Sequence, residues 1–501
     1  MSILLVVYIV TGVIIGLIMG ALPGLTVTMT AVLVVSLTFG WNMMEALAFI
    51  IGAFCGGVMG GSISAITLNI PGTAAAVATV FDGNKLKLKG EADNALSIAL
   101  FVSFLGGIFG LAFLAILGPL LGGIALKFGS QEYFLIALWG LTLVAVLSRG
   151  SFTKGLISAC IGLFIGMIGM DPITGFMRFT FNTKLLSGGI HYVVAMIGLF
   201  GMKEVFVQLS NKANFRATDT HYKLKDLLPK AKVIRKVLRC LTWSAPIGAF
   251  IGLLPGTGGD IGSLVAYGFS KQLIKKPSRP FGEGAYEGVA APEIANDAAI
   301  GGAITTMLTL GIPGDSVTAV ILGSFYMHGL LPGPTFMMTE KHYFYSIIMF
   351  MAFGILFAYI LGILGSNIML KMLNLPKWYL LPFISILCII GSYALENNIY
   401  HVIFMIVFGL MGYVFERSGY PVSPIVLAII LGPIIETNFR RGLINMGGMG
   451  NLIISFLTRP ISLIILILLV GSFLFQVKVI SKFEVNQETA GGDINAENHK
   501  G

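Results

Sequence analysis

Four proline–glycine pairs lie inside apolar sequence, two in each half of the chain: Pro23-Gly24, Pro71-Gly72, Pro255-Gly256 and Pro313-Gly314. Proline removes a backbone donor and glycine permits a positive φ, so each pair is expected to interrupt a helix. A helix that restarts after such a break presents unpaired N–H groups and the positive end of its dipole, and both attract anions. Carbonyls left free before the break can coordinate a cation such as Na⁺. The breaks therefore predict a site for an anion and a coupling cation.

The residues expected to bind the anion are the breaks themselves and the small polar residues that follow them. The candidates are Pro23, Gly24, Thr26, Pro71, Gly72, Thr73, Pro255, Gly256, Thr257, Gly258, Gly259, Pro313, Gly314 and Ser316. A Ser or Thr hydroxyl in a membrane helix also bonds to its own backbone, so each hydroxyl taken singly has a local explanation. Their clustering behind the breaks favours a role in binding.

Carboxylates near the third and fourth breaks form a second group of candidates. A charge at the centre of a membrane costs about 2.5–3.5 kcal/mol on insertion scales, so an acidic residue there indicates a function. We predict that Asp260, Asn296, Asp297 and Asp315 serve the coupling ion, with Glu293 nearby as a further candidate. For Asp260 and Asp315 the alternative is helix capping, because both lie in expected first turns.

Composition defines the class of protein that must position these residues. The chain has 501 residues, of which 56% are hydrophobic and 11% charged, and its mean hydropathy is +0.90. Soluble domains carry about 25% charged residues. We therefore expect an all-α polytopic membrane protein with about 11–13 membrane segments, some re-entrant at the breaks. No metal-ligand spacing, paired catalytic motif or nucleotide loop is visible, so neither an enzyme nor a cofactor is expected beyond a bound Na⁺.

Basic loops orient the predicted segments. Lys85, Lys87 and Lys89 share one loop, Arg149 and Lys154 another, and the largest basic cluster falls within 212–239. Cytoplasmic loops are enriched in Lys and Arg, so all three are expected on the cytoplasmic side. The predicted organisation is a first transmembrane repeat at 1–207, a basic cytoplasmic linker at 208–240, a second repeat at 241–440, C-terminal membrane segments at 441–483 and a disordered polar tail at 484–501.

The two halves resemble each other and carry opposite charge preferences. Residues 65–72 (AITLNIPG) correspond to 307–314 (MLTLGIPG), and the first and third breaks both read LPG. The loops of the first half are basic, whereas their counterparts in the second half contain few basic residues. Opposite charge preference places corresponding loops on opposite sides, which predicts an inverted repeat.

The motifs resemble those of the large membrane subunit of the tripartite tricarboxylate transporters, the TctA family. The matching segments are 20–26 (GALPGLT), 68–73 (LNIPGT), 254–259 (LPGTGG), 281–284 (FGEG), 291–298 (APEIANDA), 311–314 (GIPG) and 332–334 (PGP). Within this pattern the chain has Asp297 where members often have Asn, and Asp315 where they often have Ser.

The resemblance implies a multi-pass protein of the bacterial inner membrane. It implies two protein partners, a small four-helix membrane subunit and a periplasmic solute-binding protein. It also implies import of di- or tricarboxylates such as citrate, or of aromatic carboxylates, by symport with Na⁺ or H⁺. A channel or exporter for organic anions that needs no partner is the alternative, because the same breaks could line a pore.

Overall fold

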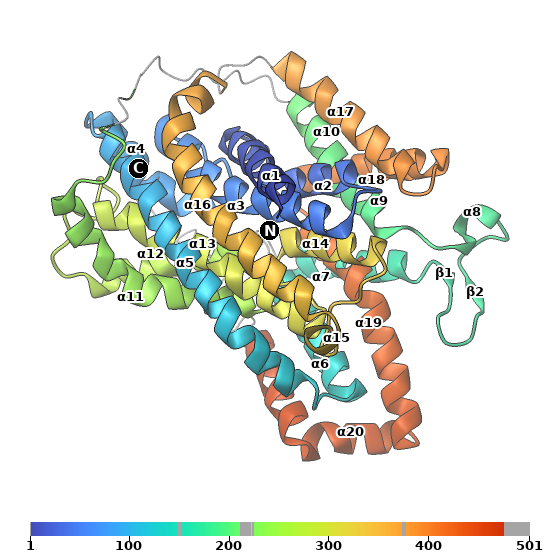
Figure 1. Cartoon of the computed structure of the whole chain (residues 1–501). Helices are drawn as coiled ribbons and strands as arrows, with labels where there is room; N and C mark the ends of the chain where they lie inside the picture. Colours follow the sequence, from blue (N-terminus) through green and yellow to red (C-terminus); the bar gives the residue numbers. More distant parts are fainter. Residues whose placement is uncertain (1, 148–151, 211–221, 223–224, 373–376, 475–501) are drawn as a thin grey trace, which may run out of the picture.

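The computed structural model describes residues 2–147, 152–210, 222, 225–372 and 377–474, and these are almost entirely helical (Figure 1). The first half contains α1 (Ile3–Ala21), α2 (Val27–Leu37), α3 (Met43–Leu68), the 3₁₀ turn η1 (Ala74–Ala76), α4 (Val77–Leu88), α5 (Ala92–Ala125), α6 (Ser130–Leu147), α7 (Phe152–Gly166), α8 (Lys184–Ser187), α9 (Tyr192–Met196), the π-helical turn η2 (Ile197–Met202) and α10 (Lys203–Ser210). Strands β1 (Gly169–Met170) and β2 (Met177–Arg178) form a short antiparallel hairpin between α7 and α8.

The second half contains α11 (Ala231–Leu253), α12 (Gly258–Leu273), α13 (Tyr286–Leu310), α14 (Ser316–Met327), α15 (Phe336–Thr339), α16 (Lys341–Met372), α17 (Lys377–Ala394), α18 (Ile399–Arg417), α19 (Ser423–Met446) and α20 (Met449–Thr458). A further helix covers Pro460–Leu474 at 91° to α20. Helix α11 begins inside the stretch predicted as the linker 208–240, and the tail predicted at 484–501 lies outside the described residues.

The fold class is confirmed as an all-α polytopic membrane protein, but fewer helices than expected are long enough to span a membrane. Within the described ranges seven helices pass by length and composition, or eight if the bent pair at Met449–Thr458 and Pro460–Leu474 counts as one span. The predicted 11–13 segments exceed this number because five other apolar helices have only 10–17 residues. Two of these, α2 and α14, begin just after a proline–glycine break.

The four breaks fall into two conformational pairs, one member of each in each half. The helices before the first and third breaks end at Leu22 and Leu254 in nearly the same extended conformation, with φ −76°, ψ 119° and φ −75°, ψ 127°. The helices before the second and fourth breaks end in the left-handed region, at Asn69 (φ 61°, ψ 24°) and Gly311 (φ 68°, ψ 19°). The sequence repeat is therefore also a repeat of local backbone geometry, while its inverted sense stays a prediction.

Glycine lets the second break of each half pack against the first. A Cβ on Gly72 would lie 2.2 Å from the carbonyl oxygen of Gly20, and one on Gly314 would lie 2.6 Å from that of Gly252. Gly20 and Gly252 each precede their proline by three residues, so the two contacts are equivalent. This close approach brings two helix breaks together in each half.

Small residues also hold the long helices together. On α1, Gly12, Gly16 and Gly20 recur every four residues and face carbonyl oxygens of α3, where an added Cβ would lie only 2.2–2.3 Å away. On α3, Gly52, Gly56 and Gly60 face carbonyl oxygens of α1 in the same way, and an added Cβ would lie 2.4–2.5 Å from them. Apolar burial cannot drive helix association in lipid, so close backbone packing must supply the attraction.

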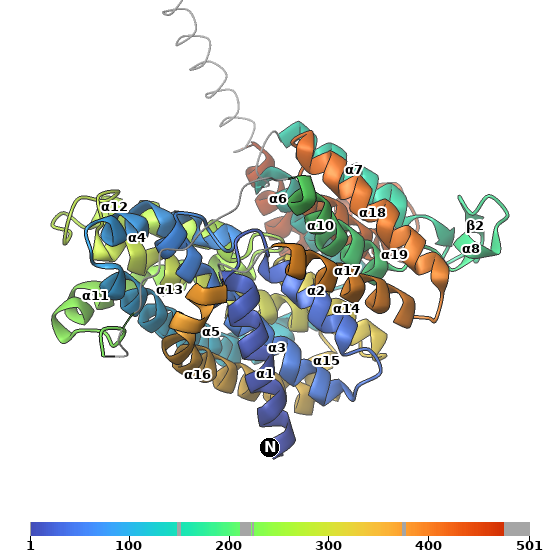
Figure 2. The ribbon, with the colours of Figure 1, turned by 90° about the horizontal axis from the view of Figure 1, so that it is seen from above.

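Helices from the two halves of the sequence pack against each other. In the first half α5 packs along α13 of the second, and α16 of the second half packs against α3 of the first. Figure 2 shows α4, α5, α11, α12, α13 and α16 on one side, with α6, α7, α10, α17, α18 and α19 on the other. Helices close in space are therefore not grouped by the half of the sequence to which they belong.

We predict that Gly16→Leu destabilises the protein, because its side chain would meet the α3 backbone at the carbonyl of Ala53. Overpacking costs about 1–3 kcal/mol in cores that can adjust, and a backbone neighbour adjusts least. The Tm of the detergent-purified chain should fall. Gly123→Leu in α5 is the matched control, because a Cβ there meets nothing within 4 Å. Equal melting of the two variants would contradict close packing of α1 on α3.

Candidate functional site

All four breaks meet at one cavity of about 550 Å³. Its walls include residues 26–28 after the first break, 73–75 after the second, 256–261 after the third and 315–317 after the fourth. Asn296 and Ile300 of α13 and Phe54 and Val58 of α3 complete one side. Four segments that are far apart in the sequence thus contribute to a single site.

Threonine side chains start the helices that follow the first two breaks. Thr26 caps α2, accepting the N–H of Met29 at 3.1 Å. Thr73 caps η1, which runs directly into α4, and accepts the N–H of Ala76 at 3.3 Å. Each cap satisfies one of the four N–H groups that a helix start leaves unpaired. Both hydroxyls therefore act locally, and the first turns that they cap lie at the cavity wall.

Asp315 starts α14 with a complete capping box. Its carboxylate accepts the N–H of Thr318 at 2.7 Å and the Thr318 hydroxyl at 2.7 Å, and that hydroxyl oxygen accepts the N–H of Asp315 at 2.9 Å. The capping interpretation of Asp315 is therefore confirmed by its geometry. Asp315 also lines the cavity, so it places a carboxyl group beside the helix start.

At the third break the backbone lies close to side chains of the neighbouring helices. Gly258, at φ +60°, would place a Cβ 2.7 Å from that of Asp315, and Gly259 would place one 2.3 Å from Oδ1 of Asn296. Any larger residue would push the start of α12 away from α13 and α14. The Thr257 hydroxyl donates to the carbonyls of Leu254 and Ile251, so it satisfies backbone acceptors freed by the break.

Asn296 presents an unpartnered donor to this cavity. The residue is 4% exposed, it lines the cavity, and its Nδ2 has no hydrogen-bond partner among the described residues. A buried donor without a partner costs about 1–3 kcal/mol. An acceptor bound in the cavity would recover that free energy, so Asn296 favours a ligand with a carboxylate or carbonyl oxygen.

The next residue, Asp297, lies behind the cavity wall. It is buried, and its Oδ2 has no hydrogen-bond partner in the part of the chain that the structure describes. One helical turn earlier, Glu293 accepts the hydroxyls of Thr79 and, at 3.2 Å, of Ser103. The two carboxyls thus share one buried polar cluster that does not open to the cavity.

The structure brings together ten of the predicted site residues and leaves eight outside the lining. Lining the cavity are Thr26, Thr73, Gly256, Thr257, Gly258, Gly259, Asp260, Asn296, Asp315 and Ser316. Outside it are Pro23, Gly24, Pro71, Gly72, Pro255, Asp297, Pro313 and Gly314. The four prolines and the glycines of the first, second and fourth breaks shape the backbone without lining the cavity, whereas Gly256 of the third break does line it.

Sequence reasoning missed the other wall of the cavity. Lys203 of α10, Glu416 of α18 and residues 419–423 before and at the start of α19 also line it. Lys203 Nζ lies 2.5 Å from Glu416 Oε2. A signal existed in the adjacent charges Lys203 and Glu204 at the end of an apolar stretch, but Glu416 is 213 residues away in the sequence.

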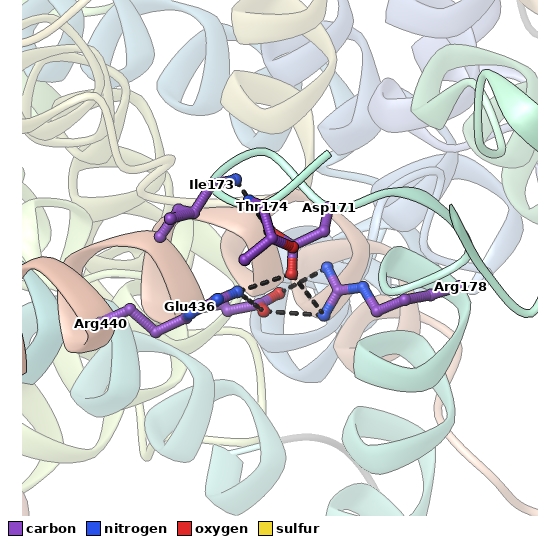
Figure 3. Close-up of polar contacts among 6 residues, drawn as sticks. All are labelled: Asp171, Ile173, Thr174, Arg178, Glu436 and Arg440. Atoms are coloured by element: carbon purple, nitrogen blue, oxygen red, sulfur yellow. Dashed lines mark hydrogen bonds and ion pairs between the residues drawn. The ribbon is translucent and has the colours of Figure 1, made fainter. Parts of the chain in front are cut away.

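A separate ion-pair network ties the β hairpin to α19, outside the cavity (Figure 3). Arg178 makes two parallel bonds to Glu436, at 2.7 and 3.1 Å. Arg440 bridges Asp171, at 2.7 Å, and Glu436, at 3.2 Å. Figure 1 shows the hairpin and α8 projecting from the helical body, so this network is what anchors the base of the projection.

The backbone N–H of Thr174 holds the pKa of Asp171 well below its usual range, helped by the Arg440 guanidinium and the N–H of Ile173. The N–H groups of Thr174 and Ile173 donate to Oδ1 at 2.9 and 2.8 Å. Since the folded pKa is lowered, this carboxylate contributes its full stabilisation above the ordinary Asp pKa. The contribution declines as the pH falls from there through the lowered pKa.

We predict that Asp171→Asn loosens the hairpin at neutral pH, because it removes one charge from between Arg440 and Arg178. Hydrogen exchange of the amides at 173 and 174 should accelerate. In the unmodified chain the same change is expected only below about pH 4, after correction for intrinsic exchange. Asp93→Asn, which removes a more exposed pair with Lys230 at 3.5 Å, is the control and should leave the hairpin protected. Unchanged exchange in Asp171→Asn would show that the network does not anchor it.

The fold and the site define a polytopic membrane protein in which interrupted helices enclose an internal cavity, the architecture of membrane transport proteins. The chain belongs to the tripartite tricarboxylate transporter TctA family, whose model matches residues 6–427. That range contains every residue that lines the cavity, from Thr26 to Ser423. The resemblance found in the motifs is therefore confirmed over most of the chain.

Two proteins of Agrobacterium vitis are similar to the chain. An "Uncharacterized 52.8 kDa protein in TAR-I ttuC' 3'region" is 35% identical over 435 residues, covering 87% of this chain and 86% of that protein. An "Uncharacterized protein in TAR-II ttuC' 3'region" is 40% identical over 215 residues, covering 43% of this chain and 87% of that protein. No solved structure matches the chain.

Proposed function

We propose that the chain is the large permease subunit of a secondary transporter that imports carboxylates by symport with Na⁺ or H⁺. The substrate is a di- or tricarboxylate such as citrate, or an aromatic carboxylate. A periplasmic solute-binding protein delivers it and a small four-helix subunit accompanies the permease in the inner membrane, with the basic linker on the cytoplasmic side. Membership of the TctA family supports this assignment.

The observation that carries the proposal is the convergence of donors on one cavity. First turns of α2, α12 and α14 line it, and each helix start is equivalent to roughly half a positive charge. Asn296 Nδ2 adds a buried donor without a protein partner. Such a set of donors suits the oxygens of a carboxylate. A cavity of about 550 Å³ is large enough for a small organic anion.

The buried cluster of Glu293 and Asp297 supplies the coupling site in this proposal. These two carboxyls lie one helical turn apart, and within the described residues the side chains that donate to Glu293 are the hydroxyls of Thr79 and Ser103. Two buried negative charges without a cation are costly, so the cluster is suited to taking up H⁺ or Na⁺. Asn296 adjoins Asp297 in α13, so one helix links the cluster to the cavity.

We predict that uptake requires both an ion gradient and the partner subunits. Proteoliposomes that contain the chain and the small subunit, supplied with binding protein and radiolabelled citrate, should accumulate citrate only when a Na⁺ or pH gradient is imposed. Omission of either partner should abolish accumulation. Uptake by the chain alone that is indifferent to both gradients would contradict the proposal and favour a channel or exporter.

We also predict that Asn296→Leu weakens substrate binding, because leucine keeps the volume and removes the donor. The loss of a hydrogen bond to a charged acceptor, about 1.5–3 kcal/mol, corresponds to a loss of roughly tenfold or more in citrate affinity. Asn438→Leu in α19 is the matched control, since its Nδ2 donates to the Ile434 carbonyl of its own helix at 2.9 Å. Calorimetric titration of the purified variants with citrate provides the measurement. Unchanged affinity in Asn296→Leu would remove Asn296 from the site.

A further inference from the structure

Lys203 is the only lysine or arginine among the described residues that line the cavity. It begins α10, directly after the π-helical turn η2, and only 9% of the residue is exposed. Its aliphatic chain packs on α18, where a Cβ on Gly412 would lie 3.0 Å from Lys203 Cγ. π-helical turns often occur at functional sites, and a buried lysine needs a partner for its charge. The groups around this ammonium group therefore indicate what it could bind.

The ammonium group has two carboxylate partners with very different exposure. Glu204 lies 3.5 Å away and its side chain is 8% exposed, whereas Glu416 lies 2.5 Å away and is 46% exposed. Glu204 also accepts a hydrogen bond from Gln208 at 2.8 Å. One partner is thus fixed in the protein interior, while the other reaches into solvent and can turn away at little cost.

The fixed partner connects Lys203 to the first break. A Cβ on Gly24, which has a φ of +89°, would lie 2.0 Å from Gln208 Nε2 and 3.1 Å from Glu204 Oε1. The turn that carries Lys203 therefore rests against the break that starts α2, one of the helices whose first turn lines the cavity. The ammonium group and this helix start are held in a defined relation on two walls of one cavity.

We propose that Lys203 binds a second carboxylate group of the substrate, and that Glu416 is the counter-ion that the substrate displaces. This inference rests on the proposed function and narrows its substrate class. One carboxylate is held at the helix starts and Asn296, and another pairs with Lys203 while Glu416 turns toward solvent. Lys203 thereby selects di- and tricarboxylates over monocarboxylates, and Glu416 competes with them for the same ammonium group.

The exposed partner, Glu416, lies two residues before Ser418, which contacts Lys154 near the start of α7, in the segment predicted as a basic loop. Lys154 Nζ donates to the Ser418 carbonyl at 2.7 Å and lies 5.1 Å from the centre of the Tyr420 ring. Ser418 and Tyr420 follow shortly after Glu416 in the sequence. Charge distribution predicts that this loop is cytoplasmic. Glu416 is therefore placed to re-form its ion pair with Lys203 on the side of the membrane where an importer releases its substrate.

The test compares three anions of increasing charge on the purified full-length chain. Acetate, succinate and citrate are titrated into the unmodified chain and into Lys203→Gln, Lys203→Arg and Glu416→Gln, with affinity read by calorimetry. Lys203→Gln should weaken succinate and citrate by about tenfold or more and change acetate little, since only the second carboxylate loses its partner. Lys203→Arg should retain most of the affinity. Glu416→Gln should strengthen succinate and citrate because the competitor has lost its charge.

Lys230→Gln is the matched control, because Lys230 also pairs with a carboxylate, Asp93 at 3.5 Å, but does not line the cavity. The inference is overturned if Lys203→Gln and Lys230→Gln bind succinate equally, or if Glu416→Gln weakens binding as much as Lys203→Gln does. If Lys203→Gln does not fold, the inference is still tested by Glu416→Gln, which should strengthen succinate binding, and by Lys203→Arg, which should retain it; weaker binding in Glu416→Gln would overturn the inference. An unmodified chain that binds none of the three anions contradicts the proposed carboxylate substrate itself, whereas binding that ignores Lys203 contradicts only this inference.

Discussion

The constraint on which the structure depends is that backbone groups freed at a helix break must find partners inside an apolar protein. The chain meets it in two ways. Thr26, Thr73 and Asp315 cap restarting helices, and the Thr257 hydroxyl returns to the carbonyls before its own break. The first turns of the restarting helices lie at the cavity wall, where they present the positive ends of the helix dipoles to a ligand. A helix break is tolerated in this apolar protein because its restarting helix is capped and lies at the cavity, and the same position makes it available to a ligand.

Glycine makes that solution fit in space. Where Gly72 meets Gly20 and Gly314 meets Gly252, two breaks approach until backbone touches backbone. Gly258 and Gly259 let the backbone of the third break approach the side chains of Asp315 and Asn296. Without side chains at these points the four restarting helices can reach one cavity. Many of the 64 glycines pack helices, but these few determine the shape of the site.

The sequence was sufficient to predict the helical membrane fold and the positions of the breaks, because these are local consequences of proline, glycine and hydropathy. It also favoured capping and function equally for Asp315, and the structure places that side chain in a cap that lines the cavity. It could not reveal the wall formed by Lys203 and Glu416, since their pairing depends on how α10 and α18 pack. Nor could it separate Asn296, which lines the cavity, from Asp297, which lies behind it.

The packing of helices from one half of the sequence against helices from the other restricts how this molecule can rearrange. Because α5 lies along α13 and α16 lies along α3, the two halves of the sequence are interlocked and cannot swing apart as rigid bodies. Residues from both groups of helices in Figure 2, each of mixed origin, line the cavity. One group contributes α12 and α13, and the other contributes α6, α10, α18 and α19. A rearrangement that alters access to this cavity would therefore have to move these mixed groups relative to each other, not one half of the sequence relative to the other.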